Sequence, residues 1–125
     1  MLSNSDRQAL YDSLQTPDAA REEIERLRLA SPMKSVGKSA LTNMVTYLWS
    51  RMMGKHLVCE SRTCEALCFM HLEHQGKALE IYPQVQMLRV ERHSVNGHRT
   101  TEPITCDALV FMVDRIVFLE CKYER

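Results

Sequence analysis

The sequence lacks several features that would assign it to a class at once. No apolar run approaches the roughly 20 residues that cross a bilayer, and the N-terminus has neither the basic region nor the apolar core of a secretory signal. The five cysteines include no Cys-x-x-Cys pair, and there is no glycine-rich phosphate loop and no Ser/His/Asp grouping. We therefore expect a cytoplasmic protein with reduced thiols and no membrane partner.

An excess of charge of either sign is also missing. The 125 residues carry 16 basic and 16 acidic side chains, so net charge gives no indication of a nucleic-acid partner. The basic residues are nevertheless uneven, because residues 31–62 hold five of them against one acid. A stretch of this kind can contact phosphates, although it is more often a solvated surface. The five candidates for DNA contact are Lys34, Lys38, Arg51, Lys55 and Arg62.

The first 32 residues are predicted to form a helical N-terminal arm. Residues 5–14 have helical apolar spacing, and Thr16-Pro17-Asp18 is typical of the start of a second helix. Residues 1–30 carry four basic and six acidic groups, which disfavours a DNA-binding helix-turn-helix. We expect an arm that packs against the rest of the protein or docks a partner.

Residues 33–125 are predicted to form one domain containing a helix and a meander of strands. A hairpin is expected over 42–59, and a helix opened by Ser61 is expected to run to about His74 and stop at Gly76. Extended segments 79–82 and 85–92 are predicted to be broken at Pro83. Asn96-Gly97 indicates a hairpin turn. The predicted class is α+β, a helix packed on a mixed, mainly antiparallel sheet.

The last two predicted strands, 105–112 and 116–122, carry charges where interior strands seldom do. Asp107 stands at the start of the first, and Glu120 and Lys122 are two apart in the second, so they share one face. Buried charges are usually paired or bind a metal. With Glu65 from the predicted helix, these carboxylates supply the oxygen ligands that Mg²⁺ or Mn²⁺ prefers, and Lys122 can stabilise charge on a phosphate.

Two other interpretations of these residues stay open. Glu120 and Lys122 can form an ordinary ion pair beside a turn residue, Asp107, since Glu-x-Lys is a common tripeptide. Separately, Cys64, Cys68 and His71 fall on one helix face, which allows a zinc site. Buried small hydrophobic cysteines are the more frequent reason for that spacing.

Four stretches of residues 43–122 are similar to a known family. They are Ser50-Arg-Met-Met-Gly54-Lys55, the segment from Glu60 through Glu65 to Phe69, Ile81-Tyr-Pro-Gln84, and Asp107-Ala-Leu-Val110 followed by Glu120-Cys-Lys122. Together they resemble the PD-(D/E)xK nuclease superfamily, and most closely the N-terminal catalytic domain of TnsA-type transposon endonucleases. Cys106 stands where the motif name has proline.

The resemblance implies a restriction-endonuclease-like fold and a site that uses magnesium or manganese. It implies catalytic roles for Glu65, Asp107, Glu120 and Lys122, with the three carboxylates as metal ligands and Gln84 as a supporting residue. The family fold usually continues past the lysine with a helix and another strand. These C-terminal elements are expected to be missing from the 125 residues, as they would be in a truncated, a naturally small or a split protein.

The resemblance also implies a biological setting. TnsA-type proteins cut the 5′ ends of a transposon while a DDE-type transposase cuts the 3′ ends, under a regulatory AAA+ ATPase. We expect the substrate to be double-stranded DNA at transposon ends and the partners to be these two proteins. We also expect a bacterial or phage origin, and a homo-oligomer is possible. The alternatives are a restriction, repair or phage nuclease of the same superfamily, and a non-catalytic assembly module on the same fold.

Overall fold

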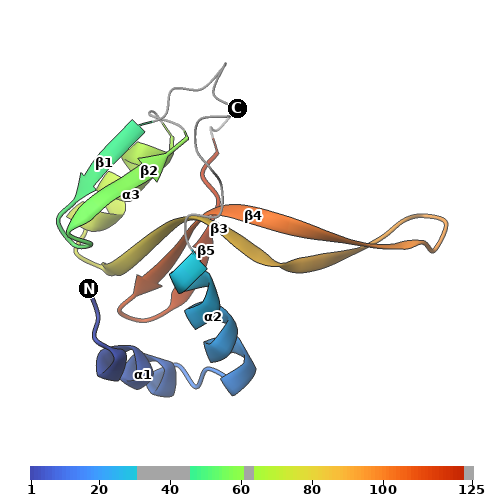
Figure 1. The fold of residues 1–125 in the computed structure, drawn as a ribbon, viewed down its shortest axis with the longest axis horizontal. Helices are drawn as coiled ribbons and strands as arrows, with labels where there is room; N and C mark the ends of the chain where they lie inside the picture. Colours follow the sequence, from blue (N-terminus) through green and yellow to red (C-terminus); the bar gives the residue numbers. More distant parts are fainter. Residues whose placement is uncertain (31–45, 61–63, 123–125) are drawn as a thin grey trace.

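The computed structural model describes residues 1–30, 46–60 and 64–122 of the 125-residue chain. This part of the chain folds into helices and antiparallel strands, an α+β arrangement (Figure 1). In chain order the elements are α1 (Asn4–Ser13), α2 (Asp18–Ala30), β1 (Thr46–Ser50), β2 (Lys55–Cys59), α3 (Glu65–His74), β3 (Ala78–His93), β4 (Arg99–Met112) and β5 (Ile116–Leu119).

The C-terminal half forms a three-stranded sheet of order β3-β4-β5. The prediction that Pro83 breaks the first segment is wrong, because β3 is one continuous strand in which Pro83 pairs with Ala108. Since β3 is at the edge of this sheet, the missing proline N–H removes no bond on the outer side. The turn predicted at Asn96-Gly97 is confirmed, with Gly97 at a φ of 78°.

Two predicted strand boundaries in this sheet are also wrong. β4 begins at Arg99, so Asp107 lies inside the strand rather than at its start. β5 ends at Leu119, which pairs with Ala108 in the last pair between β4 and β5. Glu120 and Lys122 come after the end of this strand. Strand alternation therefore does not fix which way these two side chains point.

The middle of the chain supplies a β1–β2 hairpin and the helix α3, as predicted. The hairpin joins Thr46 to Cys59 in a two-stranded sheet of its own, rather than extending the other three strands. α3 begins at Glu65 with Cys64 in the N-cap position, later than predicted; the expected cap, Ser61, lies outside the described residues.

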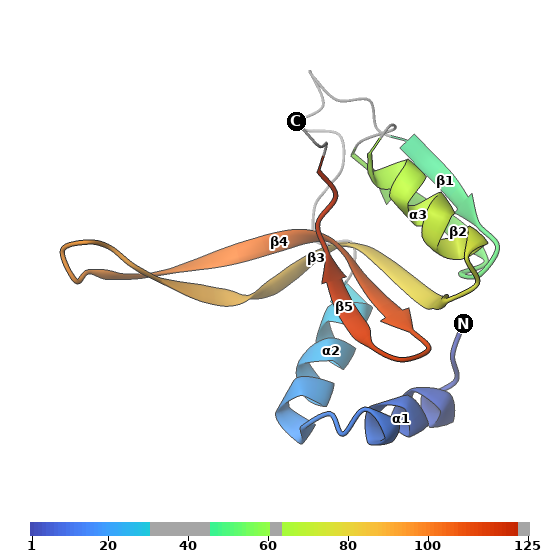
Figure 2. The same ribbon diagram turned by 180° about the vertical axis from the view of Figure 1, so that it is seen from behind.

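The helical arm packs against the three-stranded sheet of its own chain. Figures 1 and 2 show α1 and α2 on one side of this sheet, and α3 with its hairpin on the other. Tyr11 and Leu27 of the arm are fully buried in the same core as Phe111 of β4, and the Tyr11 and Phe111 rings lie 6.3 Å apart. None of the helices in the described residues is long and apolar enough to span a membrane.

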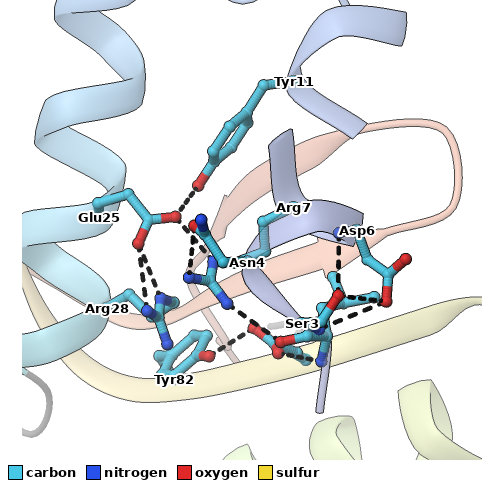
Figure 3. Close-up of polar contacts among 10 residues, drawn as sticks. Ser3, Asn4, Asp6, Arg7, Tyr11, Glu25, Arg28 and Tyr82 are labelled. Carbon is cyan, nitrogen blue, oxygen red and sulfur yellow. Dashed lines mark hydrogen bonds and ion pairs between the residues drawn. The ribbon is translucent and has the colours of Figure 1, made fainter. Parts of the chain in front are cut away.

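A partly buried carboxylate joins the two helices of the arm (Figure 3). Glu25 accepts hydrogen bonds from Arg7 Nε at 2.8 Å, Tyr11 Oη at 2.8 Å and Arg28 Nε at 3.2 Å. Arg7 is only 7% exposed, so its charge depends on this partner. Burial and the hydrogen bond to Glu25 raise the pKa of the Tyr11 hydroxyl, which stays a donor.

A second buried carboxylate fixes the arm to the sheet. Glu80 of β3 accepts the backbone N–H of Leu2 at 2.6 Å and the hydroxyl of Tyr82. Arg7 Nη1 in turn donates to the carbonyl of Leu2 at 3.0 Å. The N-terminal residues are thus held to β3 by a hydrogen bond as well as by apolar packing.

Removing the central carboxylate should loosen the arm measurably. Glu25→Ala leaves Arg7 without its ion-pair partner and Tyr11 without its acceptor, so we expect the free energy of unfolding to fall by about 2 kcal/mol. Glu23→Ala is the matched control, because Glu23 pairs with Arg26 at the surface and its loss should change stability by less than about 0.5 kcal/mol. Urea denaturation followed by circular dichroism measures both; equal changes would contradict the prediction.

Candidate active site

Glu65 is the most buried carboxylate of the predicted site, with 5% of its surface exposed. It is the first residue of α3. Glu65 Oε2 accepts the backbone N–H of Glu60 at 3.1 Å and the amide of Gln84 at 3.3 Å. These two donors hold the carboxylate in one orientation.

Gln84 reaches Glu65 through an unusual backbone conformation. Its φ is 54°, a left-handed value that costs a residue with a Cβ about 1 kcal/mol or more. The pairs Pro83–Ala108 and Val85–Cys106 continue the ladder on either side, so the strain is confined to this position. Strain of this kind concentrates at functional sites, where the surrounding structure enforces it. Gln84 itself is 1% exposed.

Asp107 lies between the same two strand pairs, on β4. Its Oδ2 accepts the backbone N–H of Cys121 at 2.6 Å, which connects the site to the chain after β5. Its side chain is also within hydrogen-bonding reach of Glu65. Two carboxyl groups that are 42 positions apart in the sequence are therefore adjacent in the fold.

The proximity of these carboxyl groups changes the chemistry of Glu65. Burial, opposed by the Glu60 N–H and reinforced by the negative charge of Asp107, raises the pKa of Glu65 to about 7. A Glu65 that keeps its proton can donate it to Asp107. A cation placed between the two groups would replace that proton and remove the repulsion between the ionised carboxylates.

Glu120 and Lys122 lie at the margin of this pair. Burial raises the pKa of the Cys106 thiol to about 11, and the negative charges of Asp107 and Glu120 add to this effect. Because Cys106 is next to Asp107 on β4, Glu120 is also near this strand. Glu120 Oε1 is 3.9 Å from Lys122 Nζ, and the two side chains are 53% and 78% exposed. The structure thus brings Glu65, Gln84 and Asp107 together, and leaves Glu120 and Lys122 paired with each other at the surface.

Cys121 is a contributor that the sequence pattern did not indicate. Its backbone N–H holds Asp107, and any residue type could supply that donor, so the sequence carries no signal for it. Burial and the neighbouring Cys68 raise the pKa of the Cys121 thiol, which disfavours a nucleophilic thiolate.

Of the basic residues proposed for DNA contact, the two that the structure describes lie away from this site. Arg51 and Lys55 are exposed at the turn of the β1–β2 hairpin, whereas Cys59, at the opposite end of β2, is the residue near Glu65. Lys34, Lys38 and Arg62 lie outside the described residues. The hairpin turn instead borders an open groove with α3, lined by Trp49, Leu67 and Met70 among others.

The donor set fits a hard cation in part. Glu65 and Asp107 offer adjacent carboxylate oxygens, the ligand type of Mg²⁺ and Mn²⁺, which take few protein ligands and keep several waters. Within residues 1–30, 46–60 and 64–122, no three His, Cys, Asp or Glu side chains converge as a ready metal site. Neither the Glu65–Asp107–Glu120 set nor the alternative zinc set of Cys64, Cys68 and His71 converges in this way.

Comparison with known protein families gives no match, and no curated protein matches the chain.

Proposed function

We propose that this protein is a metal-dependent DNA endonuclease. The observation that carries the proposal is the meeting of Glu65, Gln84 and Asp107, which come from three different elements and are held by hydrogen bonds at a strained backbone position. A merely structural pair of buried carboxyl groups has no need of such an arrangement, because apolar residues would fill the space at lower cost.

Each residue has a part in phosphodiester hydrolysis. A Mg²⁺ or Mn²⁺ ion would be held by Asp107, Glu65 and Glu120, and when bound it lowers the pKa of water and offsets charge on the phosphate. Gln84 donates to Glu65 and so fixes this carboxylate in the orientation in which it would hold the ion. Lys122, on leaving Glu120, would stabilise the negative charge that develops on the transferring phosphoryl group.

The finer assignment rests on the resemblance to TnsA-type proteins. We propose a restriction-endonuclease-like fold and a role as the 5′-end-cleaving subunit of a heteromeric transposase in the cytoplasm, acting with a DDE-type transposase and an AAA+ ATPase. Four similar stretches in the right order support it, and they include the Gln84 whose amide contacts Glu65. A restriction, repair or phage nuclease would use the same residues on other DNA.

One observation favours a second candidate, a non-catalytic assembly module. Glu120 and Lys122 pair with each other in the exposed chain after β5, away from a converged site. A protein that had lost catalysis could keep Glu65 and Asp107 as neighbouring carboxyl groups and leave the other two as surface residues.

Calorimetric titration with Mn²⁺ tests the proposal without requiring partner subunits. We expect saturable binding of one or two ions per chain at pH 7.5, with release of protons as Glu65 ionises. Supercoiled plasmid should then be nicked in Mg²⁺ or Mn²⁺ at least about 100-fold faster than in EDTA, either by the chain alone or with transposase partners. Heats no larger than dilution would contradict the nuclease proposal and support the assembly module.

A further inference from the structure

β3 and β4 extend well beyond the third strand of their sheet. β5 pairs with β4 only from Ala108 to Phe111, whereas β3 and β4 remain paired as far as His93 and Arg99. The segments Val85–His93 and Arg99–Cys106, with the turn between them, thus form a two-stranded β-ribbon. Figures 1 and 2 show this β-ribbon projecting from the body of the protein, away from the helices.

The outer part of the β-ribbon has no buried face. Every residue from Glu91 to Thr101 is exposed. A two-stranded ribbon without an apolar face is marginally stable in water, so its length adds little to the stability of the fold. A long projecting element of this kind is better explained by contact with another molecule.

The side chains of the outer β-ribbon suit a polar, anionic partner. Residues 91–101 include two arginines and two histidines against one carboxylate, together with the hydrogen-bonding side chains of serine, threonine and asparagine. Glu91 Oε1 lies 3.3 Å from Arg99 Nε and 3.8 Å from His93 Nε2, and all three side chains are at least half exposed. Such surface pairs contribute only about 0–1 kcal/mol, so a phosphate can compete for Arg99.

Protein interfaces have a different composition. Their centres are enriched in aromatic residues and methionine, and residues 91–101 contain none of either, with Val95 as the only large apolar side chain. The major groove of B-DNA, about 12 Å wide, admits a two-stranded β-ribbon. The shape and the composition of this element therefore both favour a nucleic-acid duplex over a second protein.

We propose that the β-ribbon binds double-stranded DNA in the groove, with Arg92 and Arg99 contacting phosphates. This inference rests on the proposed action on DNA and adds the surface that holds the duplex. The β-ribbon begins at the level of Gln84 and Asp107, and Arg99 is eight residues along β4 from Asp107, roughly 26 Å at 3.3 Å per residue. A duplex bound by the outer β-ribbon could therefore continue to the candidate site.

Fluorescence anisotropy with a labelled duplex of about 30 base pairs, in EDTA, tests the inference on the full chain. We expect Arg92→Ala/Arg99→Ala to weaken binding about tenfold and to reduce the slope of log affinity against log salt by about 1.8, the value for two phosphates. Arg92→Lys/Arg99→Lys should keep the wild-type slope, because the charges remain.

The matched control is Arg26→Ala/Arg115→Ala, which removes two exposed arginines from α2 and the β4–β5 turn. It makes the same change in net charge and should weaken binding less than twofold. Equal losses in both double variants, or no binding of the duplex by the wild-type protein, would overturn the inference. Sedimentation velocity showing self-association that only the β-ribbon variant loses, with unchanged DNA affinity, would assign the β-ribbon to a protein contact instead.

The outcome can be separated from that of the nuclease proposal. If Mn²⁺ does not bind but the β-ribbon variant loses DNA affinity, the nuclease proposal fails and the β-ribbon inference stands. If metal-dependent nicking occurs while the β-ribbon variant binds DNA normally, the β-ribbon inference fails and the nuclease proposal stands.

Discussion

Asp107→Asn is expected to abolish Mn²⁺ binding and to reduce metal-dependent nicking about 1,000-fold, a loss of about 4 kcal/mol in transition-state stabilisation. Asp107 is the carboxylate that lies beside Glu65, and it is anchored by the N–H of Cys121 at 2.6 Å. Asparagine keeps an oxygen that can accept this N–H, so the local backbone should not move. What is lost is the negative charge that a cation requires.

The stability of the variant distinguishes a lost ligand from a lost fold. Removing the charge of Asp107 also removes its repulsion of Glu65, so metal-free Asp107→Asn should be at least as stable as the wild type at pH 8. Asp114→Asn, in the exposed turn before β5, is the matched control and should bind Mn²⁺ and nick DNA normally. An Asp107→Asn protein that folds and still nicks DNA at the wild-type rate would contradict the proposed role.

Elements that depend on local chemistry could be predicted from the sequence. Asn96-Gly97 and Gly76 mark a turn and a helix end because glycine adopts a positive φ without a steric penalty, and the structure has φ values of 78° and 69° at Gly97 and Gly76. The β1–β2 hairpin followed from β-branched and aromatic residues around a turn. Pro83 misled the prediction because its effect depends on whether its strand is at an edge, which is a property of the whole sheet.

The candidate site depends on contacts that a single sequence does not encode in any local pattern. Spacing could not decide whether Glu65 and Asp107 meet, since the two residues are 42 positions apart in the sequence. The left-handed conformation of Gln84 has no signature, because glutamine seldom adopts it. The boundary of β5 was wrong because Glu120 to Lys122 continue an apolar β-type run, while the pairing with β4 ends at Leu119. The start of β4 at Arg99 was missed because alternation does not show how far two strands stay paired.

The second large effect expected is a dependence of stability on pH that Glu65 alone causes. The pKa of this carboxyl is about 7 in the folded protein and 4.5 as a free side chain. The folded state thus holds the Glu65 proton more tightly than the unfolded state does. Its stabilising effect is complete below pH 4.5 and is lost as the pH rises through 7, a change of about 3 kcal/mol at 1.36 kcal/mol per pKa unit.

Glu65→Gln should remove this dependence. The glutamine amide oxygen can still accept the N–H of Glu60, while the variant has no proton to lose. We expect the free energy of unfolding of the metal-free wild type, measured in urea with EDTA, to fall by about 3 kcal/mol relative to Glu65→Gln between pH 4.5 and pH 8. Other titrating groups are common to both proteins and cancel in the difference. Parallel stability curves for the two proteins would refute the assignment.

Metal should restore the stability that is lost at high pH. A cation between Glu65 and Asp107 would remove the repulsion between the two ionised carboxylates, as the Glu65 proton does at low pH. We expect Mn²⁺ at pH 8 to raise the stability of the wild type in proportion to the logarithm of its concentration once the site is saturated. Asp107→Asn should show no such increase. Stabilisation of Asp107→Asn equal to that of the wild type would place the ion elsewhere. The pH at which Mn²⁺ begins to stabilise should follow the pKa of Glu65, because the proton and the ion compete for the same oxygens.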